Sequence, residues 1–418
     1  MAFSREQKYA LAVLTLINFF NYVDRQVIFP LFASIKQEFL ITDFQLGLLG
    51  TVFMLVHSLA SVPLGVLADK YSHKIIIASG VFFWSVVTLL SGFARSFSQL
   101  LSLRSLVGVG EASYAPPATA IISESFPQKM RSRVQGVFSL GMFAGGSLGA
   151  MLGGAMVFYT NNWRAAFFIV AIPGMLLALA SARLKTSAHK AAAADRPSMA
   201  AVFKLWKNPA YMWLLISGTL ITFSAGAFIS WSTEFAHRYK GYNLRDAALI
   251  LGSTMLLAGI TGVVLGSHFA DKAYSRFNWG RAGVIAASLT LAFPFIWLAV
   301  MLNRGFLFMA CFFLGIALQC FYNGPVIAVI HDIVPRHIRA TAFAIYLLVI
   351  HLLGDTLSPA IIGKISDLKG LQTGMEIAAV FILAAGLTFL PVCYYIKTKR
   401  TPIYTDEQNE FVDEGVPL

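Results

Sequence analysis

Long apolar runs are the feature that most restricts how this chain can fold. A helix needs about 20 mostly apolar residues to cross the hydrocarbon layer of a membrane. Twelve such runs lie approximately at residues 9–31, 44–68, 75–94, 98–122, 134–158, 164–183, 210–233, 247–270, 281–301, 305–330, 340–363 and 375–396. The sequence therefore predicts an all-α membrane protein with twelve transmembrane helices.

The composition argues against a soluble fold. Apolar residues make up 57% of the 418 residues and charged residues 12%, whereas a soluble protein needs a larger polar share to cover its surface. The three cysteines, Cys311, Cys320 and Cys393, lie within apolar runs and fit neither a metal-ligand spacing nor a disulfide framework. We therefore expect no metal site and no cofactor.

A polar stretch divides the chain near its middle. It predicts an N-terminal six-helix half at 1–184, a linker at 185–208, a C-terminal six-helix half at 209–397 and a tail at 398–418. Two short repeats support a duplication: Ala-Asp-Lys at 68–70 recurs at 270–272, and segment 126–131 resembles segment 334–339. Parallel repeats with a binding site at their interface are typical of transporters.

The basic residues predict the topology. With the N-terminus placed in the cytoplasm, 21 of the 32 Lys and Arg residues fall in inner segments and nine in outer ones. The positive-inside rule then puts both termini, the linker and the tail in the cytoplasm, and we expect a bacterial-type inner (plasma) membrane. Because the net charge of +12 reflects topology, we expect no nucleic-acid partner. The expected partners are protons, membrane lipids and a small-molecule or lipid substrate. We expect the protein to be a monomer.

Four ionisable residues lie inside apolar runs of the N-terminal half: Asp24, Arg25, Arg104 and Glu111. A charge in hydrocarbon costs about 2.5 to 3.5 kcal/mol and needs a partner or a water-filled cavity. Arg104 and Glu111 are seven residues apart, so they share one helix face about 10 Å apart along the axis. One interpretation is purely structural, with two ion pairs that join Asp24 to Arg104 and Arg25 to Glu111.

The other interpretation adds proton exchange and substrate binding to the same four residues. A buried carboxylate beside an arginine stays ionised. When an anionic substrate binds the guanidinium instead, the carboxylate loses its partner charge, and burial then favours its protonated form. Arginine suits an anionic headgroup because its planar donors bind carboxylate or phosphate bidentately. We expect Asp24 and Glu111 to couple protons, Arg25 and Arg104, with Tyr22, to bind substrate, and a proton gradient to supply the energy.

The C-terminal half offers weaker candidates. His351 and Asp355 are spaced i,i+4 and can touch, either as a structural hydrogen bond or as a secondary proton relay. Trp231, Tyr322 and Asn323 each offer either a neutral substrate contact or ordinary packing. In the N-terminal half, we expect His57 to stand alone, packed or bonded to a carbonyl.

Aromatic residues in the seventh and tenth runs could line an apolar wall for an acyl chain, or they could face lipid. These residues are Phe223, Phe228, Trp231, Phe312, Phe321 and Tyr322. Of these, Trp231 and Tyr322 are the expected substrate contacts. Along such a wall each buried CH₂ would contribute about 0.8 kcal/mol.

Three motifs resemble known families. Residues 65–74 (GVLADKYSHK) resemble the signature between the second and third helices of the major facilitator superfamily. Residues 21–25 (NYVDR) and 104–114 (RSLVGVGEASY) resemble the Spinster family. The resemblance implies two six-helix halves, alternating access and a proton-linked carrier of lysophospholipids or sphingosine-1-phosphate. The NYVDR pattern is also similar to symporters of sugar acids and organic anions in the same superfamily.

The superfamily resemblance also implies a gate. The loop after the second helix is thought to close the inner side, which would give this role to Gly65, Asp69 and Lys70. Asp69 could accept hydrogen bonds from Arg131 or Arg133. Alternatively, the basic residues of this loop serve only as inner topology anchors.

The fifth run contains a ridge of glycines. Gly141, Gly145, Gly149 and Gly153 recur every four residues, which favours backbone contact with another helix. The ridge could serve packing alone or could also slide during transport.

Other classes of function lack motifs. The chain has no His-Glu-x-x-His pair, no Gly-x-Ser-x-Gly elbow and no Walker motif, so we expect neither an enzyme nor an ATP-driven pump. A channel or scramblase would not need paired carboxylates. The sequence favours a proton-coupled secondary transporter of an anionic amphiphile such as a lysophospholipid. The alternative is a proton symporter of small organic anions such as sugar acids.

Overall fold

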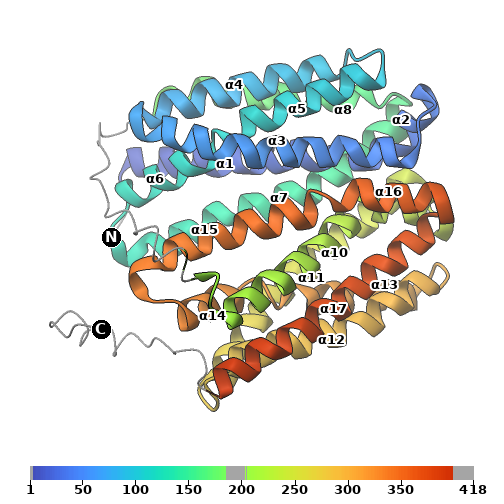
Figure 1. Ribbon diagram of the computed structural model, residues 1–418. Helices are drawn as coiled ribbons and strands as arrows, with labels where there is room; N and C mark the ends of the chain where they lie inside the picture. The colour runs from blue at the N-terminus through green and yellow to red at the C-terminus, as the bar shows by residue number, and fades with distance from the viewer. Residues whose placement is uncertain (1–2, 185–202, 204, 399–418) are drawn as a thin grey trace. The chain divides into compact units, whose positions relative to one another are not determined.

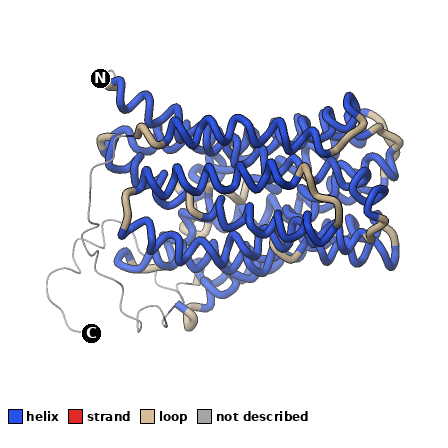
Figure 2. The backbone as a smooth tube through the Cα atoms, turned by 90° about the horizontal axis from the view of Figure 1, so that it is seen from above, coloured by secondary structure: helices blue, strands red, loops and turns tan. Residues whose placement is uncertain are grey.

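A computed structural model describes residues 3–184, 203 and 205–398, and for residues 69, 123, 128, 129, 131–133 and 337 only the backbone. Within these residues the regular structure is helical throughout, and Figure 2 shows helices joined by loops without a strand. The predicted tail lies almost entirely outside the described residues, as does most of the predicted linker.

The first helices in the chain are α1 (Arg5–Val27), η1 (Phe29–Leu31), α2 (Phe32–Phe39), α3 (Asp43–Lys70), α4 (His73–Ser91), α5 (Phe97–Ala112), α6 (Ala115–Ser125), α7 (Gln128–Thr160) and α8 (Arg164–Ser181) (Figure 1). They are followed by α10 (Pro209–Lys240), α11 (Leu244–Tyr274), α12 (Gly280–Met301), α13 (Phe306–Cys320), α14 (Pro325–Ile333), η2 (Arg336–Ile338), α15 (Arg339–Ile350), η3 (His351–Asp355), α16 (Ser358–Lys369) and α17 (Leu371–Lys397). The predicted apolar runs are therefore helical.

Ten segments of the described chain are long and apolar enough to cross a membrane, which makes this an all-α integral membrane protein. The runs of α1 and of α5–α6 are not among the ten. These are the runs that contain Asp24, Arg25, Arg104 and Glu111, and α5 is only 16 residues long. The count of twelve spans stays a prediction.

Prolines interrupt two of the runs that were predicted as single helices. α5 ends at Ala112 and α6 begins with Ala115 before Pro116 and Pro117, because proline lacks the N–H that an interior turn requires. α13 ends at Cys320 and α14 begins at Pro325, 208 residues after Pro117. The interruption thus recurs at the offset of the sequence repeat. The eleventh run has a π-helical turn, η3, in its middle.

The chain forms two compact units that are described separately. Unit 1 comprises Met1–Ala192, Phe228–Leu256 and Ser358–Gly374, and unit 2 comprises Ala193–Ala227, Leu257–Leu357 and Met375–Leu418. Unit 1 therefore includes parts of α10 and α11, the whole of α16 and the beginning of α17, together with the helices from α1 to α8. The predicted chain division at 185–208 stays a prediction.

The glycine ridge of α7 packs directly on α1 within unit 1. A Cβ added at Gly145 would lie 2.2 Å from the carbonyl oxygen of Phe19, and one at Gly149 would lie 2.5 Å from that of Val23. Gly141 and Gly153 meet carbonyl oxygens of α1 in the same way, at 2.7 and 2.4 Å. The predicted backbone contact is confirmed, with α1 as the partner helix, and it fixes the direction in which α1 presents its charged residues.

Unit 2 uses similar close contacts and buried hydroxyl groups. A Cβ at Gly262 of α11 would lie 2.2 Å from the carbonyl oxygen of Ala317 of α13. The buried Tyr211 of α10 donates to the carbonyl of Ala342 of α15 at 2.7 Å. Each contact joins helices that are distant in sequence, so that unit 2 has a packed interior of its own.

Candidate transport site

Two ion pairs join α1 to α5 inside unit 1. The Nε of Arg25 donates to Oε2 of Glu111 at 2.7 Å, and Nη1 of Arg104 donates to Oδ1 of Asp24 at 3.1 Å. Adjacent residues on a helix point about 100° apart, so Asp24 and Arg25 reach different partners one above the other on α5. Both pairings expected from the sequence are confirmed as contacts.

The Asp24 pair is sealed inside the helices. Asp24 and Arg104 are each 1% exposed. The second carboxylate oxygen of Asp24 accepts a hydrogen bond from the hydroxyl of Thr88 on α4. The guanidinium of Arg104 lies 4.9 Å from the ring centre of Phe53 on α3, which is within range of a cation–π contact. Four helices therefore enclose this pair.

The Arg25 pair lies at the edge of the same cluster. Glu111 is 1% exposed, whereas the side chain of Arg25 is 15% exposed. Tyr22 is partly buried, and its ring centre lies 4.9 Å from the guanidinium of Arg25. Of the predicted substrate contacts in this cluster, a ligand can thus reach Arg25 and Tyr22 in this structure, while Arg104 becomes accessible only if its surroundings open.

His57 belongs to this cluster, contrary to the expectation that it stands alone. Its Nε2 lies 2.8 Å from Nη2 of Arg25. The reason is the close packing of α3 on α5 at Gly108, where an added Cβ would lie 2.6 Å from the carbonyl oxygen of Phe53 and 3.2 Å from the backbone nitrogen of His57. Spacing within one helix gives no sign of this contact, because it depends on a glycine 51 residues away.

Two buried polar atoms of the cluster have no hydrogen-bond partner among the described residues. They are Oε1 of Glu111 and Nε of Arg104. A buried polar atom without a partner destabilises the fold by about 1 to 3 kcal/mol. The cluster therefore has an acceptor on Glu111 and a donor on Arg104 that could bind a further partner.

The expected neutral contacts are not gathered beside the ion pairs. Trp231, in unit 1, is fully buried, donates from Nε1 to the carbonyl of Pro359 at 3.0 Å and packs on Phe32, which favours the packing interpretation. Tyr322, in unit 2, is buried, and its hydroxyl has no partner among the described residues. Asn323 is exposed in the turn after α13 and donates to the carbonyl of Cys320 at 3.4 Å.

The expected aromatic wall is divided between the two units. Phe228 and Trp231 belong to unit 1, and the other four aromatic residues belong to unit 2. Within unit 2, Phe223 stacks on Phe381 at 4.3 Å between ring centres. This stack accounts for the position of Phe223 by packing within its own unit, and the role of the six residues as an acyl-chain wall stays a prediction.

The pair of His351 and Asp355 is confirmed as a contact. Nδ1 of His351 and Oδ2 of Asp355 lie 2.9 Å apart on the π-helical turn η3 of unit 2, with the two side chains 42% and 22% exposed. A π-helical turn inside an α-helix often marks a functional position. The geometry fits either interpretation, a hydrogen bond or a relay.

The expected gate residues are only partly described. Gly65 lies on α3 with no atom within 4 Å of an added Cβ, and Lys70 is the exposed last residue of that helix. The side chains of Asp69, Arg131 and Arg133 lie outside the described residues. Their gating role stays a prediction.

A second charged network, around Asp43 at the start of α3, was not expected. Asp43 is 2% exposed. It accepts from Nη1 of Arg238 at 2.6 Å, from Nζ of Lys36 at 2.6 Å and from the hydroxyl of Ser366. Arg238 also donates to Glu234, four residues earlier on α10, at 2.6 Å. That i,i+4 spacing was the one signal of the network in the sequence.

A residue of α16, Asp367, also caps the N-terminus of α3 beside this network. The two carboxylate oxygens of Asp367 accept from the backbone nitrogens of Asp43 and Phe44 at 2.8 and 2.9 Å. A carboxylate at a helix N-terminus is favoured by the helix dipole. The Asp43 network therefore ties α2, α3, α10 and α16 together within unit 1.

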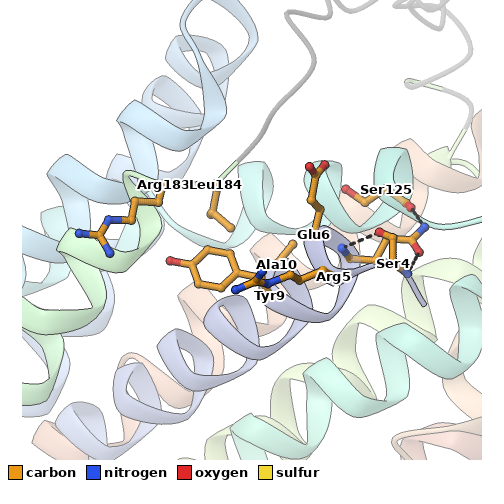
Figure 3. A pocket seen from close by; sticks show the side chains of 9 residues that line it. Ser4, Arg5, Glu6, Tyr9, Ala10, Ser125, Arg183 and Leu184 are labelled. Carbon is orange, nitrogen blue, oxygen red and sulfur yellow. Dashed lines mark hydrogen bonds between the residues drawn. The ribbon is translucent and has the colours of Figure 1, made fainter. Parts of the chain in front are cut away.

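A cavity of about 540 Å³ lies elsewhere, at the beginning of α1. Figure 3 shows its lining, which includes the exposed Arg5, Tyr9 and Arg183. At this cavity Nε2 of Gln7 donates to the carbonyl of Ser125 at 2.7 Å. Arg5 is 19 residues from Asp24, or about 28 Å along α1 at 1.5 Å per residue. Because its charged groups remain in water, this cavity does not compete with the buried cluster as the candidate site.

Paired charges enclosed among apolar membrane helices are typical of transporters, because such charges in a membrane protein mark substrate, ion or proton pathways. Residues 14–359 match the family model of the Major Facilitator Superfamily. The chain belongs to this superfamily and, within it, to the Spinster family.

The family is shown by relatives from several animals. The human protein spinster homolog 3 is 31% identical over 94% of this chain and 84% of its own length. The zebrafish sphingosine-1-phosphate transporter SPNS2 is 31% identical over 86% of this chain and 76% of its own length. The fruit-fly protein spinster is also 31% identical, and the match spans 62% of its length. The chain is thus a transporter of the major facilitator type.

Solved structures agree on the fold. A bacterial homolog of the human lysosomal transporter Spinster, crystallised in an inward-facing and unoccupied conformation, superposes with a TM-score of 0.85 at 24% identity over 97% of this chain and all of the other. A point mutant of the nucleoside transporter NupG gives a TM-score of 0.73 at 15% identity over 92% of this chain and 99% of the other. At these identities the likeness shows the fold alone.

Proposed function

We propose that this chain is a proton-coupled secondary active transporter of an anionic amphiphile, a lysophospholipid or a sphingolipid-like molecule, that works by alternating access. The observation that supports it most is Arg25, a partly exposed cation whose other side binds the fully buried Glu111 at 2.7 Å. A headgroup anion that reaches Arg25 competes with Glu111 for the guanidinium. Glu111 then accepts a proton, which links anion binding to proton binding.

The other charged residues extend this coupling. Asp24 is a second proton-coupling group, because its buried carboxylate is held at 3.1 Å from the guanidinium of Arg104 and needs a proton once that contact is lost. In this proposal, Arg104 meets the headgroup once Asp24 is protonated and the pair separates. His351 and Asp355 are the secondary proton-transfer candidates, and Asp69 with Gly65, Lys70 and Arg131 would gate the inner side.

The amphiphile is favoured by a relative. The zebrafish relative is a sphingosine-1-phosphate transporter. Sphingosine-1-phosphate combines a phosphate with a long hydrocarbon chain. Arginine donors fit a phosphate bidentately, and Tyr22, Trp231, Tyr322 and Asn323 are proposed as further contacts. A symporter of small organic anions, such as sugar acids, is the alternative, because the Arg25 site requires only an anion.

The proposal includes a topology and an energy source. We propose twelve spans in two six-helix halves, supported by the proline interruptions that recur 208 residues apart at Pro117 and Pro325. Both termini lie on the cytoplasmic side of a bacterial-type inner membrane, as the distribution of Lys and Arg predicts. The protein acts as a monomer without a cofactor, and a proton gradient drives transport.

Binding to purified protein tests the substrate class. Lysophospholipids with one headgroup and increasing acyl chain length would be titrated beside a sugar acid. We expect affinity to rise with chain length, because each buried CH₂ contributes about 0.8 kcal/mol, and Arg25→Ala to weaken binding at every length. Tight binding of the sugar acid with no response to lysolipids would contradict the amphiphile and favour the alternative.

A further inference from the structure

His57 contacts the candidate site through the substrate-facing arginine. Its Nε2 lies 2.8 Å from Nη2 of Arg25, while Nε of the same guanidinium donates to Glu111 at 2.7 Å. The imidazole of His57 and the carboxylate of Glu111 therefore contact different nitrogens of the same guanidinium. Whatever changes the imidazole changes which donors Arg25 can offer to another anion.

The identity of the partner determines the state of the imidazole. A guanidinium has five N–H donors and no acceptor, so the ring nitrogen facing it must accept and cannot carry a proton. The contact therefore requires neutral His57 with its hydrogen on Nδ1. Histidine is the side chain whose unperturbed titration lies nearest to neutral pH, so a pH titration can test whether the contact depends on a proton.

The charged groups around His57 belong to the site itself. From α1 the imidazole faces Arg25, with Asp24 beside it, and from α5 the carboxylate of Glu111 and the guanidinium of Arg104 lie on the face that packs against α3.

Charges on the other helices that pack on α3 lie toward its ends. Lys364 of α16 lies over the ring of Phe44, and Asp367 caps the first residues of α3, about 20 Å from His57 at 1.5 Å per residue. His73 and Lys74 of α4 and Lys36 of α2 lie beyond the two ends of α3 in the sequence. The α6 helix also packs on α3, and its charged residue is Glu124, next to its last residue.

We propose that His57 is a positioning residue that holds Arg25 in a proton-dependent way. When a proton binds Nε2, the lone pair that accepts from Nη2 is lost, the Arg25–His57 hydrogen bond breaks and an imidazolium stands beside the guanidinium. The Nη2 donor that His57 releases can then bind an anion at the exposed edge, where that anion competes with Glu111 for the guanidinium. Proton binding and anion binding thus favour each other, and the inference rests on the proposed function only for the nature of the anion.

The direct test does not need a substrate. In protein labelled with both ¹⁵N-histidine and ¹⁵N-arginine, the signals of one of the eight histidines disappear in His57→Gln and are thereby assigned, and the side-chain signals of Arg25 are assigned in the same way with Arg25→Lys. At neutral pH we expect an unprotonated Nε2 and a protonated Nδ1, and on acidification we expect the side-chain signals of Arg25 to shift with the midpoint of His57. A proton on Nε2 at neutral pH, or no response of Arg25, would overturn the inference.

Binding variants separate positioning from packing. The probe is 1-oleoyl lysophosphatidic acid, titrated at pH 8 and pH 6. Wild type should bind at least about 5-fold more tightly at the lower pH, a factor typical of coupled sites. His57→Gln can accept from Arg25 but does not titrate, so it should bind with a smaller change between the two pH values, after correction for the titration of the ligand that both proteins share. His57→Leu accepts nothing and should bind more weakly at both.

The control is His268→Gln, a histidine exposed on α11 of unit 2, which should retain the wild-type pH response. A His57→Gln protein with the full wild-type response would overturn the inference. If wild type does not bind the lysolipid at all, the proposed substrate class fails, and the NMR titration still decides the role of His57.

Discussion

Arg25 of α1 and Glu111 of α5 form an ion pair of 2.7 Å in which the carboxylate is fully buried and the guanidinium is partly exposed. This asymmetry distinguishes the pair from that of Asp24 and Arg104, in which both groups are buried. One pair can be opened by a ligand from outside, whereas the other requires the helices to move. The two pairs should therefore respond differently to substitution.

The Asp24–Arg104 pair should dominate the stability of the cluster. Arg104→Met leaves Asp24 buried without its charge partner and should destabilise the protein by about 3 to 5 kcal/mol, seen as a lower Tm in thermal unfolding. Asp24→Leu combined with Arg104→Met removes both charges and should restore most of the loss. A double variant as unstable as Arg104→Met alone would show that the pair itself is not the source of the effect.

The ridge of α7 should tolerate a methyl group only away from α1. Gly145→Ala places a Cβ against the carbonyl of Phe19, which lies 2.2 Å from the ideal position, and should destabilise the fold by about 1 to 3 kcal/mol. The matched control on the same helix is Gly136→Ala, where no atom lies within 4 Å and alanine improves helix propensity by up to about 1 kcal/mol. Equal thermal stability of the two variants would contradict the described packing of α1 on α7.

The Asp43 network should keep α3 and α16 together at the proposed outer side. Asp43→Asn removes the anion that binds Arg238 and Lys36, so spin labels at the exposed Leu40 and Leu368, both in unit 1, should show a longer or broader distance distribution. Asp246→Asn, which removes a carboxylate that bonds locally to Asn243, is the control. An unchanged distribution in Asp43→Asn would mean that the cap from Asp367 alone holds this junction.

The sequence predicted the parts of the site that depend on one helix or on the cost of burying charge. The apolar runs, the glycine ridge and the two ion pairs follow from spacing and from the exclusion of unpaired charge from hydrocarbon. His57 and Asp43 could not be placed in this way, because their partners lie on other helices. His57 reaches Arg25 of α1 where α3 packs closely on Gly108 of α5, and the partners of Asp43 come from α2, α10 and α16. The breaks at Pro116 and Pro325 were available in the sequence but were hidden by the continuity of the apolar runs.

Glu38, which lies outside the apolar spans, pairs with Arg164, the first residue of α8, and this pair should give a small pH-dependent contribution to stability. Two hydrogen bonds from Arg164, at 2.6 and 2.7 Å, together with one from Trp163, hold the pKa of Glu38 below its ordinary value. A lowered folded-state pKa means that the stabilisation is present above the unfolded-state pKa and is lost as the pH falls through the folded-state pKa.

Because Glu38 is 41% exposed, Glu38→Gln should lower stability by no more than about 1 kcal/mol at pH 7. The difference from wild type in thermal unfolding should shrink toward acid pH. A difference of the same size at every pH would assign it to packing on Trp163 instead of to charge.

Proton-coupled transport by Glu111 is tested most directly in proteoliposomes containing purified wild type or Glu111→Gln. The glutamine can still accept from Arg25 but cannot exchange a proton, so the variant should remain folded and bind an anionic lysophospholipid. Transfer of that lipid between leaflets, followed by extraction with albumin, should be accelerated by an imposed pH gradient in wild type and should not respond to the gradient in Glu111→Gln. Gradient-driven transfer in Glu111→Gln at the wild-type rate would contradict the account.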